Sequence, residues 1–266
     1  MWKYKLLIAL FIPVFVSAKV HYAKVEPYES VVLKSAVSAL VVEADLELEG
    51  SIVTSKRVIH LDDTLDKSNL TDAKKSVILL ERMLIINEEI ASSLNGTVKR
   101  QKGYYERISK LSTASKTQKD NAYSSFTSAK TQYLSTREKI ISLEKQIMDM
   151  NYKVAQLNDS IKKKSIVLED KYLYKLLVRK GDFVNPGVAL AQVEDASRAK
   201  LVLFLEAEEL QGVKEKTIYL NGEKTAYHVN KVWRMADEKF ISSYRAEIYI
   251  EAPKGLFSKL MKIEIK

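Results

Sequence analysis

The segment 122–161 reads AYSSFTSAKTQYLSTREKIISLEKQIMDMNYKVAQLNDSI, and apolar side chains return in it at alternating steps of three and four residues. The two interleaved series are Phe126, Tyr133, Ile140, Ile147, Val154, Ile161 and Ala122, Ala129, Thr136, Leu143, Met150, Leu157. A seven-residue repeat kept over five heptads is typical of the a and d positions of a coiled coil rather than of a single surface helix. The segment is therefore predicted to be one long helix with a packed seam.

The residues before this segment carry the same repeat. Their series are Leu70, Val77, Leu84, Ala91, Val98, Tyr105 and Ala73, Leu80, Asn87, Leu94, Gln101, Ile108. Between the two runs, residues 112–115 read STAS, and Ser115 is a good helix N-cap. Two helices of about 45 residues, at 1.5 Å per residue, would form an antiparallel hairpin roughly 65–70 Å long. The polar d positions Asn87, Gln101 and Thr136 are expected to set register rather than to bind a ligand.

Basic charge is concentrated in this hairpin. The chain has 43 Lys+Arg and 34 Asp+Glu over 266 residues, and residues 66–164 hold 19 of the former and 11 of the latter. The basic side chains around the predicted bend are Lys99, Arg100, Lys102, Arg107, Lys110, Lys116 and Lys119. A patch of one sign at the end of a long lever favours an acidic partner, since it steers and orients encounter. Nucleic acid is the other standard partner for such a patch, but the export predicted from residues 1–18, described next, argues against it.

The first eighteen residues predict export. Lys3 and Lys5 precede an apolar run at 6–16, and Val16-Ser17-Ala18 offers small residues at a cleavage site. The run is shorter than the ~20 apolar residues that a spanning helix needs. We expect a signal peptide at 1–18 with cleavage after Ala18, and an uncleaved membrane anchor is the alternative.

Short β-runs flank the hairpin on both sides. They lie at 31–33, 40–42, 52–53 and 58–59 before it, and at 172–178 and 188–193 after it. Neither set has enough strands to bury a core alone, so the two are predicted to form one small barrel-like domain with the hairpin inserted between them. Residues 199–266 predict a small antiparallel β-barrel, with a sandwich as the alternative, a hairpin turn at Asn221-Gly222 and a short helix at 206–214.

Catalytic and metal chemistry find little support. The chain has no cysteine and three widely spaced histidines. His60 and Asp62 would share one face of a strand, with Asp63 on the other face. Two ligands are too few for a closed metal site, so a solvated strand end is expected there. We predict a protein that is not an enzyme and has no catalytic residue, cofactor or metal.

Residues 28–266 resemble the HlyD-like membrane fusion proteins, also called periplasmic adaptor subunits. The most specific stretches are LLVRKGDFVNPG at 176–187 and the segment from Asp195 to Leu205. The resemblance implies an α+β fold in which a long antiparallel coiled-coil hairpin is inserted in a split lipoyl-like β domain and followed by a β-barrel. The implied divisions are a signal peptide at 1–18, an N-terminal segment with the first lipoyl-like half at 19–64, the hairpin at 65–164, the second half at 165–196 and the barrel at 197–266. The chain departs from the family at Ala39 and Lys171, where glycine is usual in the turns.

The resemblance also implies a function. Such proteins associate with the inner membrane in the Gram-negative periplasm and form a ring, usually of six copies. They couple an inner-membrane transporter to an outer-membrane exit channel in a tripartite efflux pump. A resistance-nodulation-division transporter is favoured here, and an ABC transporter is the alternative. Arg107, Leu111 and Ser115 match the family's channel-docking tip. The basic residues around that tip are Lys99, Arg100, Lys102, Lys110, Lys116 and Lys119.

Three other interpretations fit parts of the sequence. An adaptor for type I protein secretion stays open, although the short leader favours efflux. A structural envelope coiled coil without a transporter would leave the paired β halves unexplained. A lipoyl or biotin carrier needs a lysine at the tight turn between the halves, and the hairpin replaces that turn.

Overall fold

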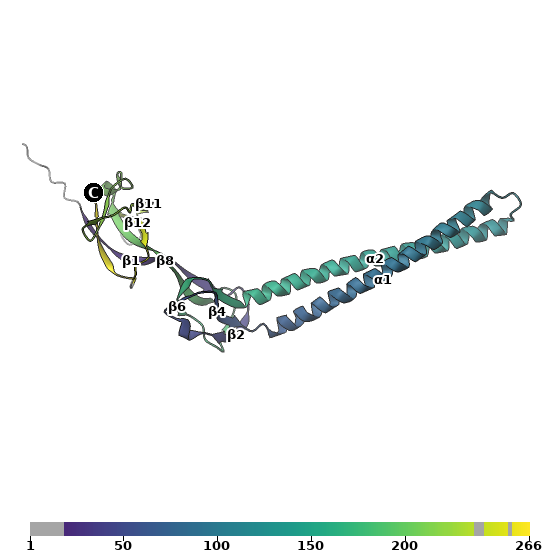
Figure 1. The fold of residues 1–266 in the computed structure, drawn as a ribbon, viewed down its shortest axis with the longest axis horizontal. Coiled ribbons are helices and arrows are strands. Elements are labelled where there is room, and N and C mark those ends of the chain that lie inside the picture. The colour runs from purple at the N-terminus through teal and green to yellow at the C-terminus, as the bar shows by residue number, and fades with distance from the viewer. Residues whose placement is uncertain (1–18, 237–241, 255–256) are drawn as a thin grey trace, which may run out of the picture.

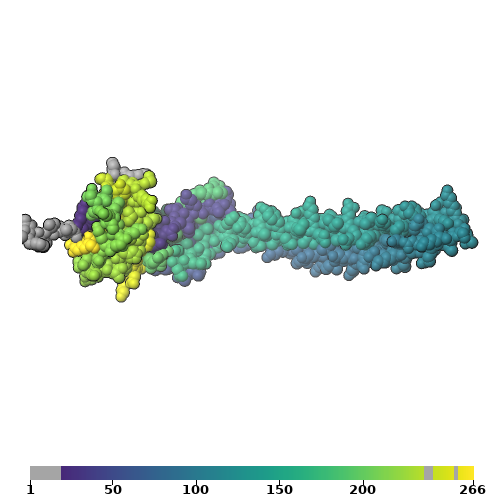
Figure 2. Space-filling view, turned by 90° about the horizontal axis from the view of Figure 1, so that it is seen from above, coloured from purple at the N-terminus to yellow at the C-terminus, as the bar shows by residue number. Residues whose placement is uncertain are grey.

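The computed structural model describes residues 19–236, 242–254 and 257–266, and they form an elongated molecule with three parts in line (Figure 1). A curled sheet lies at one end, a small β domain follows, and a long helical hairpin projects from it. Figure 2 shows the same order in the turned view, with the two helices side by side along most of the length. The predicted signal peptide at 1–18 lies outside the described residues.

The hairpin consists of α1 (Thr64–Lys110) and α2 (Lys116–Lys163). Every predicted a and d position in both helices is buried or half-buried, which confirms the seam. Its most deeply buried apolar side chains are Ala122, Ile140 and Leu143. With 47 and 48 residues, the helices extend about 70 Å.

The buried polar residue of the seam is satisfied within its own helix. Asn87 is almost fully buried, and its side-chain amide donates to the Met83 carbonyl at 2.7 Å. A buried amide with such a partner avoids the full desolvation penalty of an unpaired donor. The seam therefore accommodates Asn87 without a ligand.

The small β domain is assembled from strands on both sides of the hairpin. Those before it are β2 (Ala39–Ala44), β3 (Ser51–Val53) and β4 (Lys56–Leu61). Those after it are β5 (Ser165–Leu168), β6 (Lys171–Leu176) and β7 (Phe183–Val184). Each strand of the first set pairs antiparallel with one of the second, β4 with β5, β3 with β6 and β2 with β7. The predicted insertion of the hairpin into a split β domain is thus confirmed.

Ala39 and Lys171 occupy positions where the family usually has glycine, and neither has a left-handed φ value. The left-handed φ values fall on other residues, Ser55 at 48° and Asp170 at 50°. Lys171 instead begins β6, and its Nζ lies 2.8 Å from Oδ2 of Asp195. A side chain at Lys171 is therefore compatible with the fold, because the turn takes its unusual conformation one residue earlier.

The curled sheet contains the C-terminal strands and two long strands shared with the small β domain. Its members are β1 (Val20–Lys34), β8 (Ala189–Glu206), β9 (Ile218–Leu220), β10 (Glu223–Lys224), β11 (Val229–Ala236), β12 (Ser243–Glu251) and β13 (Leu260–Ile265). The order is β10-β9-β13-β1-β8-β12-β11, and the sheet curls into a half-barrel around Leu201, Leu203, Ile248 and Ile263.

Two local predictions for this region have different outcomes. Asn221 and Gly222 have φ values of 53° and 91° and join β9 to β10, which confirms the predicted turn. The helix predicted at 206–214 is shorter and is a 3₁₀ helix, η2 (Ala207–Leu210). Its short length fits the steep cost of extending 3₁₀ geometry beyond a few residues.

The strands β1 and β8 run through both β domains. The first residues of β1 pair with β13 in the half-barrel, whereas its last residues pair with the first part of β8 beside the small domain. Ala23 and Val25 accordingly belong to the half-barrel core. At the junction, the Arg198 guanidinium lies 3.9 Å from the centre of the Tyr28 ring, which packs edge-on against Tyr249. The two β domains are thus joined by continuous strands, whose register shifts between Pro27 and Glu29 beside the packed rings.

Candidate functional site

The tip of the hairpin is a short bend on a tightly paired support. Helix α1 ends at Lys110, and the Leu111 N–H donates to the Ile108 carbonyl at 3.2 Å. Just below the bend, the Tyr105 ring lies 5.4 Å from Tyr123 and stacks on Phe126 at 6.2 Å. These aromatic contacts hold the two helices together at the bend, so the tip residues have fixed positions.

Ser115 caps α2, as predicted. Its hydroxyl accepts from the Gln118 N–H at 3.2 Å, and the Gln118 side chain accepts from the Ser115 N–H at 2.9 Å. This reciprocal capping box satisfies two donors that would otherwise be left free at the helix start. The first role of Ser115 in the structure is therefore to fix the bend.

Leu111 is the apolar feature of the tip. It lies at the edge of the bend, as predicted, and 48% of its surface is exposed. Burying an exposed leucine side chain fully is worth about 2 kcal/mol. Leu111 can therefore serve as an apolar anchor for a partner that covers the end of the hairpin.

Arg107 lies on the flank of the tip rather than at its end. Gly103, one turn before it, is so close that a Cβ there would lie 3.6 Å from an Arg107 guanidinium nitrogen. Helix side chains tilt toward the N-terminus, which in α1 is the direction away from the bend. Arg107 is thus one turn before the bend, as predicted, and its guanidinium faces the side of the hairpin.

The basic residues around the tip keep most of their charge unpaired. Only Lys102 has an ion pair among them in the described part of the chain, with Glu106 at 3.7 Å. Arg100 donates to the Thr97 hydroxyl at 3.0 Å, and Lys119 is half-buried. Lys99, Lys110 and Lys116 are exposed to solvent. The tip therefore presents an apolar anchor surrounded by positive charge.

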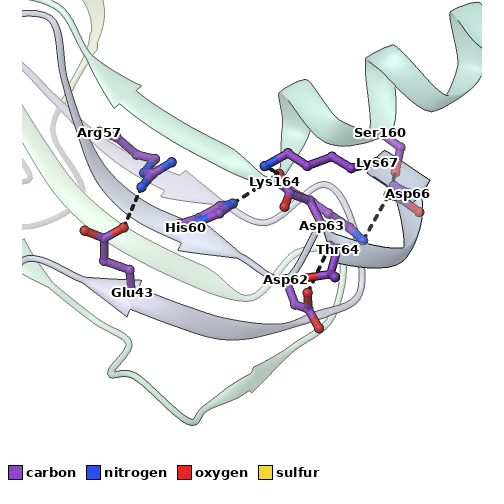
Figure 3. Close-up of polar contacts among 10 residues, drawn as sticks. All are labelled: Glu43, Arg57, His60, Asp62, Asp63, Thr64, Asp66, Lys67, Ser160 and Lys164. Carbon is purple, nitrogen blue, oxygen red and sulfur yellow. Dashed lines mark hydrogen bonds and ion pairs between the residues drawn. The ribbon is translucent and has the colours of Figure 1, made fainter. Parts of the chain in front are cut away.

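A second polar cluster fixes the other end of the hairpin (Figure 3). Oδ2 of Asp63 lies 3.1 Å from Nε2 of His60 and 2.9 Å from Nζ of Lys67. Asp62 is exposed, as expected for a solvated strand end, whereas Asp63 is only 5% exposed and departs from that expectation. The alternation of faces does not extend to this residue because β4 ends at Leu61. Asp62, beyond the strand, instead accepts from the Thr64 N–H at 3.1 Å.

Asp66 joins the two helices at their base. It accepts from the Ser160 hydroxyl at 2.6 Å and lies 3.0 Å from the ammonium of Lys164 (Figure 3). Sequence analysis missed this cluster. One signal was available for part of it, since Asp63 and Lys67 have the i, i+4 spacing of a helical ion pair. The contacts of Asp66 with residues 94 and more positions away have no such local signal.

The carboxyls of this base cluster are held ionised. Burial opposes the ionisation of Asp63, but the bonds from Lys67 and His60 outweigh it and lower its pKa. The Ser160 hydroxyl, aided by Lys164, lowers the pKa of Asp66 against its partial burial. Because the folded pKa values lie below those of the unfolded chain, the resulting stability is complete above pH ~4 and is lost as the pH falls through the folded values.

We expect Asp63→Asn to lower the free energy of unfolding at pH 7 by about 2 kcal/mol, since it removes a charged hydrogen-bond partner from a buried position. The variant should also lose less stability than the wild type between pH 5 and pH 3. Thermal unfolding followed by circular dichroism across this range measures both effects. Asp72→Asn is the matched control, because Asp72 is exposed and its carboxylate forms an ion pair with the exposed Lys75 at 3.4 Å. An Asp63→Asn protein as stable as this control would contradict the assignment.

The described residues contain neither a metal-binding cluster nor a membrane-spanning helix. No group of three or more His, Cys, Asp or Glu side chains in these residues is placed to hold a metal ion. None of the helices formed by these residues has the length and apolar character needed to cross a membrane.

A hairpin inserted in a split β domain, followed by a curled half-barrel, defines the fold of the membrane fusion proteins, and the chain has this fold. A crystal structure of MacA from Actinobacillus actinomycetemcomitans is similar with a TM-score of 0.72 at 14% identity, over 93% of this chain and 78% of that one. The membrane fusion protein Spr0693 from Streptococcus pneumoniae R6 is similar with a TM-score of 0.56 at 9% identity, over 94% of this chain and 99% of that one.

A chimera of MacA that contains the MexA α-hairpin domain of Pseudomonas aeruginosa gives a TM-score of 0.55 at 14% identity, over 93% of this chain and 78% of that one. No protein-family model matches the sequence, and no curated protein matches it. The likeness is thus one of fold, at low sequence identity.

Proposed function

We propose that the protein is a periplasmic adaptor subunit of a tripartite efflux pump and couples an inner-membrane transporter to an outer-membrane channel. One observation carries the proposal. A rigid hairpin of about 70 Å, fixed at its base by Asp63 and Asp66, holds an exposed leucine and unpaired positive charge far from both β domains. Such a lever is suited to join two partners that do not touch each other.

Each part of the molecule has a role in this proposal. The half-barrel and the small lipoyl-like domain contact the transporter, and the strands β1 and β8 run through both. At the other end, Leu111 packs into the channel. Arg107 contacts the side of the channel's helical ends, and Ser115 keeps the bend in shape. The surrounding lysines and Arg100 orient the tip toward an acidic rim, because charges of one sign raise the rate of productive encounter.

We also propose where the protein acts, how its copies assemble and which class of transporter it serves. The chain acts in the periplasm, where its transporter partner holds it at the inner membrane. Several copies, in a ring of six, surround the path between transporter and channel. The transporter is of the resistance-nodulation-division or the ABC class. No nucleic acid partner is involved.

Capture of the partners tests the function. The full chain with a C-terminal tag is expressed in its own cells, cross-linked, solubilised in detergent and purified. We expect one integral inner-membrane transporter to copurify, together with an outer-membrane channel protein. Loss of the chain should raise drug susceptibility to the same degree as loss of that transporter. Recovery of the chain with neither membrane protein would contradict the proposal and favour a structural envelope coiled coil.

A further inference from the structure

Two stripes of exposed apolar side chains lie on the hairpin outside its seam. The α1 stripe consists of Leu79, Met83, Ile86 and Ile90, which are 44–58% exposed. The α2 stripe consists of Leu134, Ile141 and Met148, which are 52–65% exposed. The α1 residues recur every three or four positions and the α2 residues every seven, so each stripe stays on one face of its helix. Large apolar side chains that gather in this way mark an interaction surface rather than scattered surface residues.

The two stripes lie on opposite faces of the hairpin. In heptad terms, the α1 stripe occupies c and g positions, and the α2 stripe occupies b positions. When two helices pack antiparallel, the b and e positions of both helices share one face, and the c and g positions share the other. A flat partner on one side would therefore cover one stripe and leave the other exposed.

The stripes also lie at the same height along the hairpin. The contacts near its two ends, Asp66 with Ser160 and Tyr105 with Tyr123, fix the pairing of the helices. This pairing places Ile141 level with Ile86. A second copy rotated about an axis parallel to the hairpin can thus bring its α1 stripe against the first copy's α2 stripe without any shift along the axis. A head-to-tail contact of this kind closes into a ring, whereas one that needs a shift gives an open fibre.

The charges beside the stripes match across such a contact. Arg82 and Glu89 lie at f positions beside the α1 stripe, and Glu144 and Arg137 lie at e positions on the corresponding edge of the α2 stripe. By the same pairing, Arg82 is level with Glu144, and Glu89 is level with Arg137. No ion pair joins any of the four to another residue in the described part of the chain. Each is therefore available to an oppositely charged residue of a neighbouring copy.

We propose that the α2 stripe of one copy packs against the α1 stripe of the next, flanked by ion pairs of Arg82 with Glu144 and of Glu89 with Arg137. This contact repeats around the ring and holds the hairpins parallel, so that all tips lie at one height. The inference rests on the proposed ring-forming adaptor and identifies the surfaces through which its copies meet.

Disulfide cross-linking in cells tests the contact, and the absence of native cysteine makes it specific. The double variant Ile86→Cys/Ile141→Cys of the full chain is oxidised in the periplasm with copper phenanthroline. We expect a ladder of covalent multimers that ends at the closed ring, and at most dimers from each single variant. The two cysteines cannot pair within one chain because they lie on opposite faces. Absence of the ladder would overturn the proposal.

A control pair has the same chemistry but a different geometry. Ile85 is exposed like Ile141, lies at a b position of α1 on the same face as the α2 stripe and, by the same pairing, is nearly level with Ile141. The head-to-tail arrangement keeps Ile85 of one copy away from Ile141 of the next. Ile85→Cys/Ile141→Cys should therefore give no ladder. A ladder from this pair instead would show that like faces meet, which contradicts the proposed arrangement.

Charge reversal tests the pairs themselves. In the Ile86→Cys/Ile141→Cys background, Arg82→Glu places two acidic side chains together and should lower the multimer yield about fivefold. Adding Glu144→Arg restores opposite charges and should restore the yield. Equal yields in all three proteins, or a further loss in the last, would contradict the pairing.

The outcomes also separate this inference from the function on which it rests. A normal ladder without any copurifying transporter would leave the contact in place and overturn the adaptor function. Copurification of transporter and channel without a ladder would do the reverse.

Discussion

Replacement of Leu111 by aspartate should abolish transport and leave the fold and the transporter contact intact. Leu111 is half-exposed beyond the last turn of α1 and outside the a and d series, so the substitution leaves the seam residues themselves unchanged. In the docked state, however, it would place an unpaired charge where an apolar anchor is buried. Loss of such an anchor costs ~2 kcal/mol or more, which weakens channel binding roughly 30-fold or more. The measurement is drug susceptibility at matched expression levels, together with cross-linking to the outer-membrane channel.

Two control variants show which property of the tip matters. Leu111→Met keeps an apolar side chain of similar volume and should transport normally. Lys99→Glu changes a charge on the rim and should reduce transport less, with a deficit that depends on ionic strength. Cells carrying Leu111→Asp that pump and cross-link like the wild type would show that the tip does not dock, and that the hairpin acts through its flanks.

The hairpin was predictable from the sequence because its determinants are local and repeated. A heptad pattern states which side chains face the partner helix, and the burial of Ile140 and Leu143 follows from it directly. The cap at Ser115 was predictable for the same reason, since a capping box lies within four consecutive residues. Turn chemistry likewise identified Asn221-Gly222.

The features that depend on distant residues were not predictable. Nothing near Val20 indicates that β1 continues through both β domains, because its partners in β8 and β13 lie more than 150 positions away. In the sequence, Asp66 resembles any acidic residue in the first turn of a helix, because its partners Ser160 and Lys164 come close only in the folded chain. The guanidinium of Arg107 lies back beside Gly103, a detail that the spacing to Leu111 does not contain.

The stripes that we assign to the contact between copies lie outside the heptad seam and were not predicted from the sequence. A heptad pattern predicts that a and d residues face the partner helix and that residues at the other positions face solvent. Ile141 follows the seam residue Ile140 directly, yet it points about 100° away from it around the helix and is exposed to a neighbour. Exposed apolar residues at b, c and g positions were thus visible in the sequence, but their common height became evident only from the pairing of α1 with α2.

Ile140 and Ile141 therefore give the sharpest comparison that the chain offers. Ile140 is 3% exposed in the seam, and Ile141 is 60% exposed in the α2 stripe. We expect Ile140→Asp to lower the free energy of unfolding by about 3 kcal/mol or more, because it opens a cavity and buries a charge between the helices. Ile141→Asp should leave the unfolding of the dilute monomer nearly unchanged, since its side chain stays in water.

The two variants should separate again in assembly. At protein concentrations where the wild type forms rings, Ile141→Asp should stay monomeric with full helicity, because the α2 stripe then meets its neighbour with a charge in the middle. Circular dichroism and light scattering on the same samples measure helicity and mass together. If Ile141→Asp lost as much stability as Ile140→Asp, the seam would be assigned to the wrong face. If Ile141→Asp assembled like the wild type, the copies would not meet through the stripes, and the hairpins of the ring would be held apart by their β domains alone.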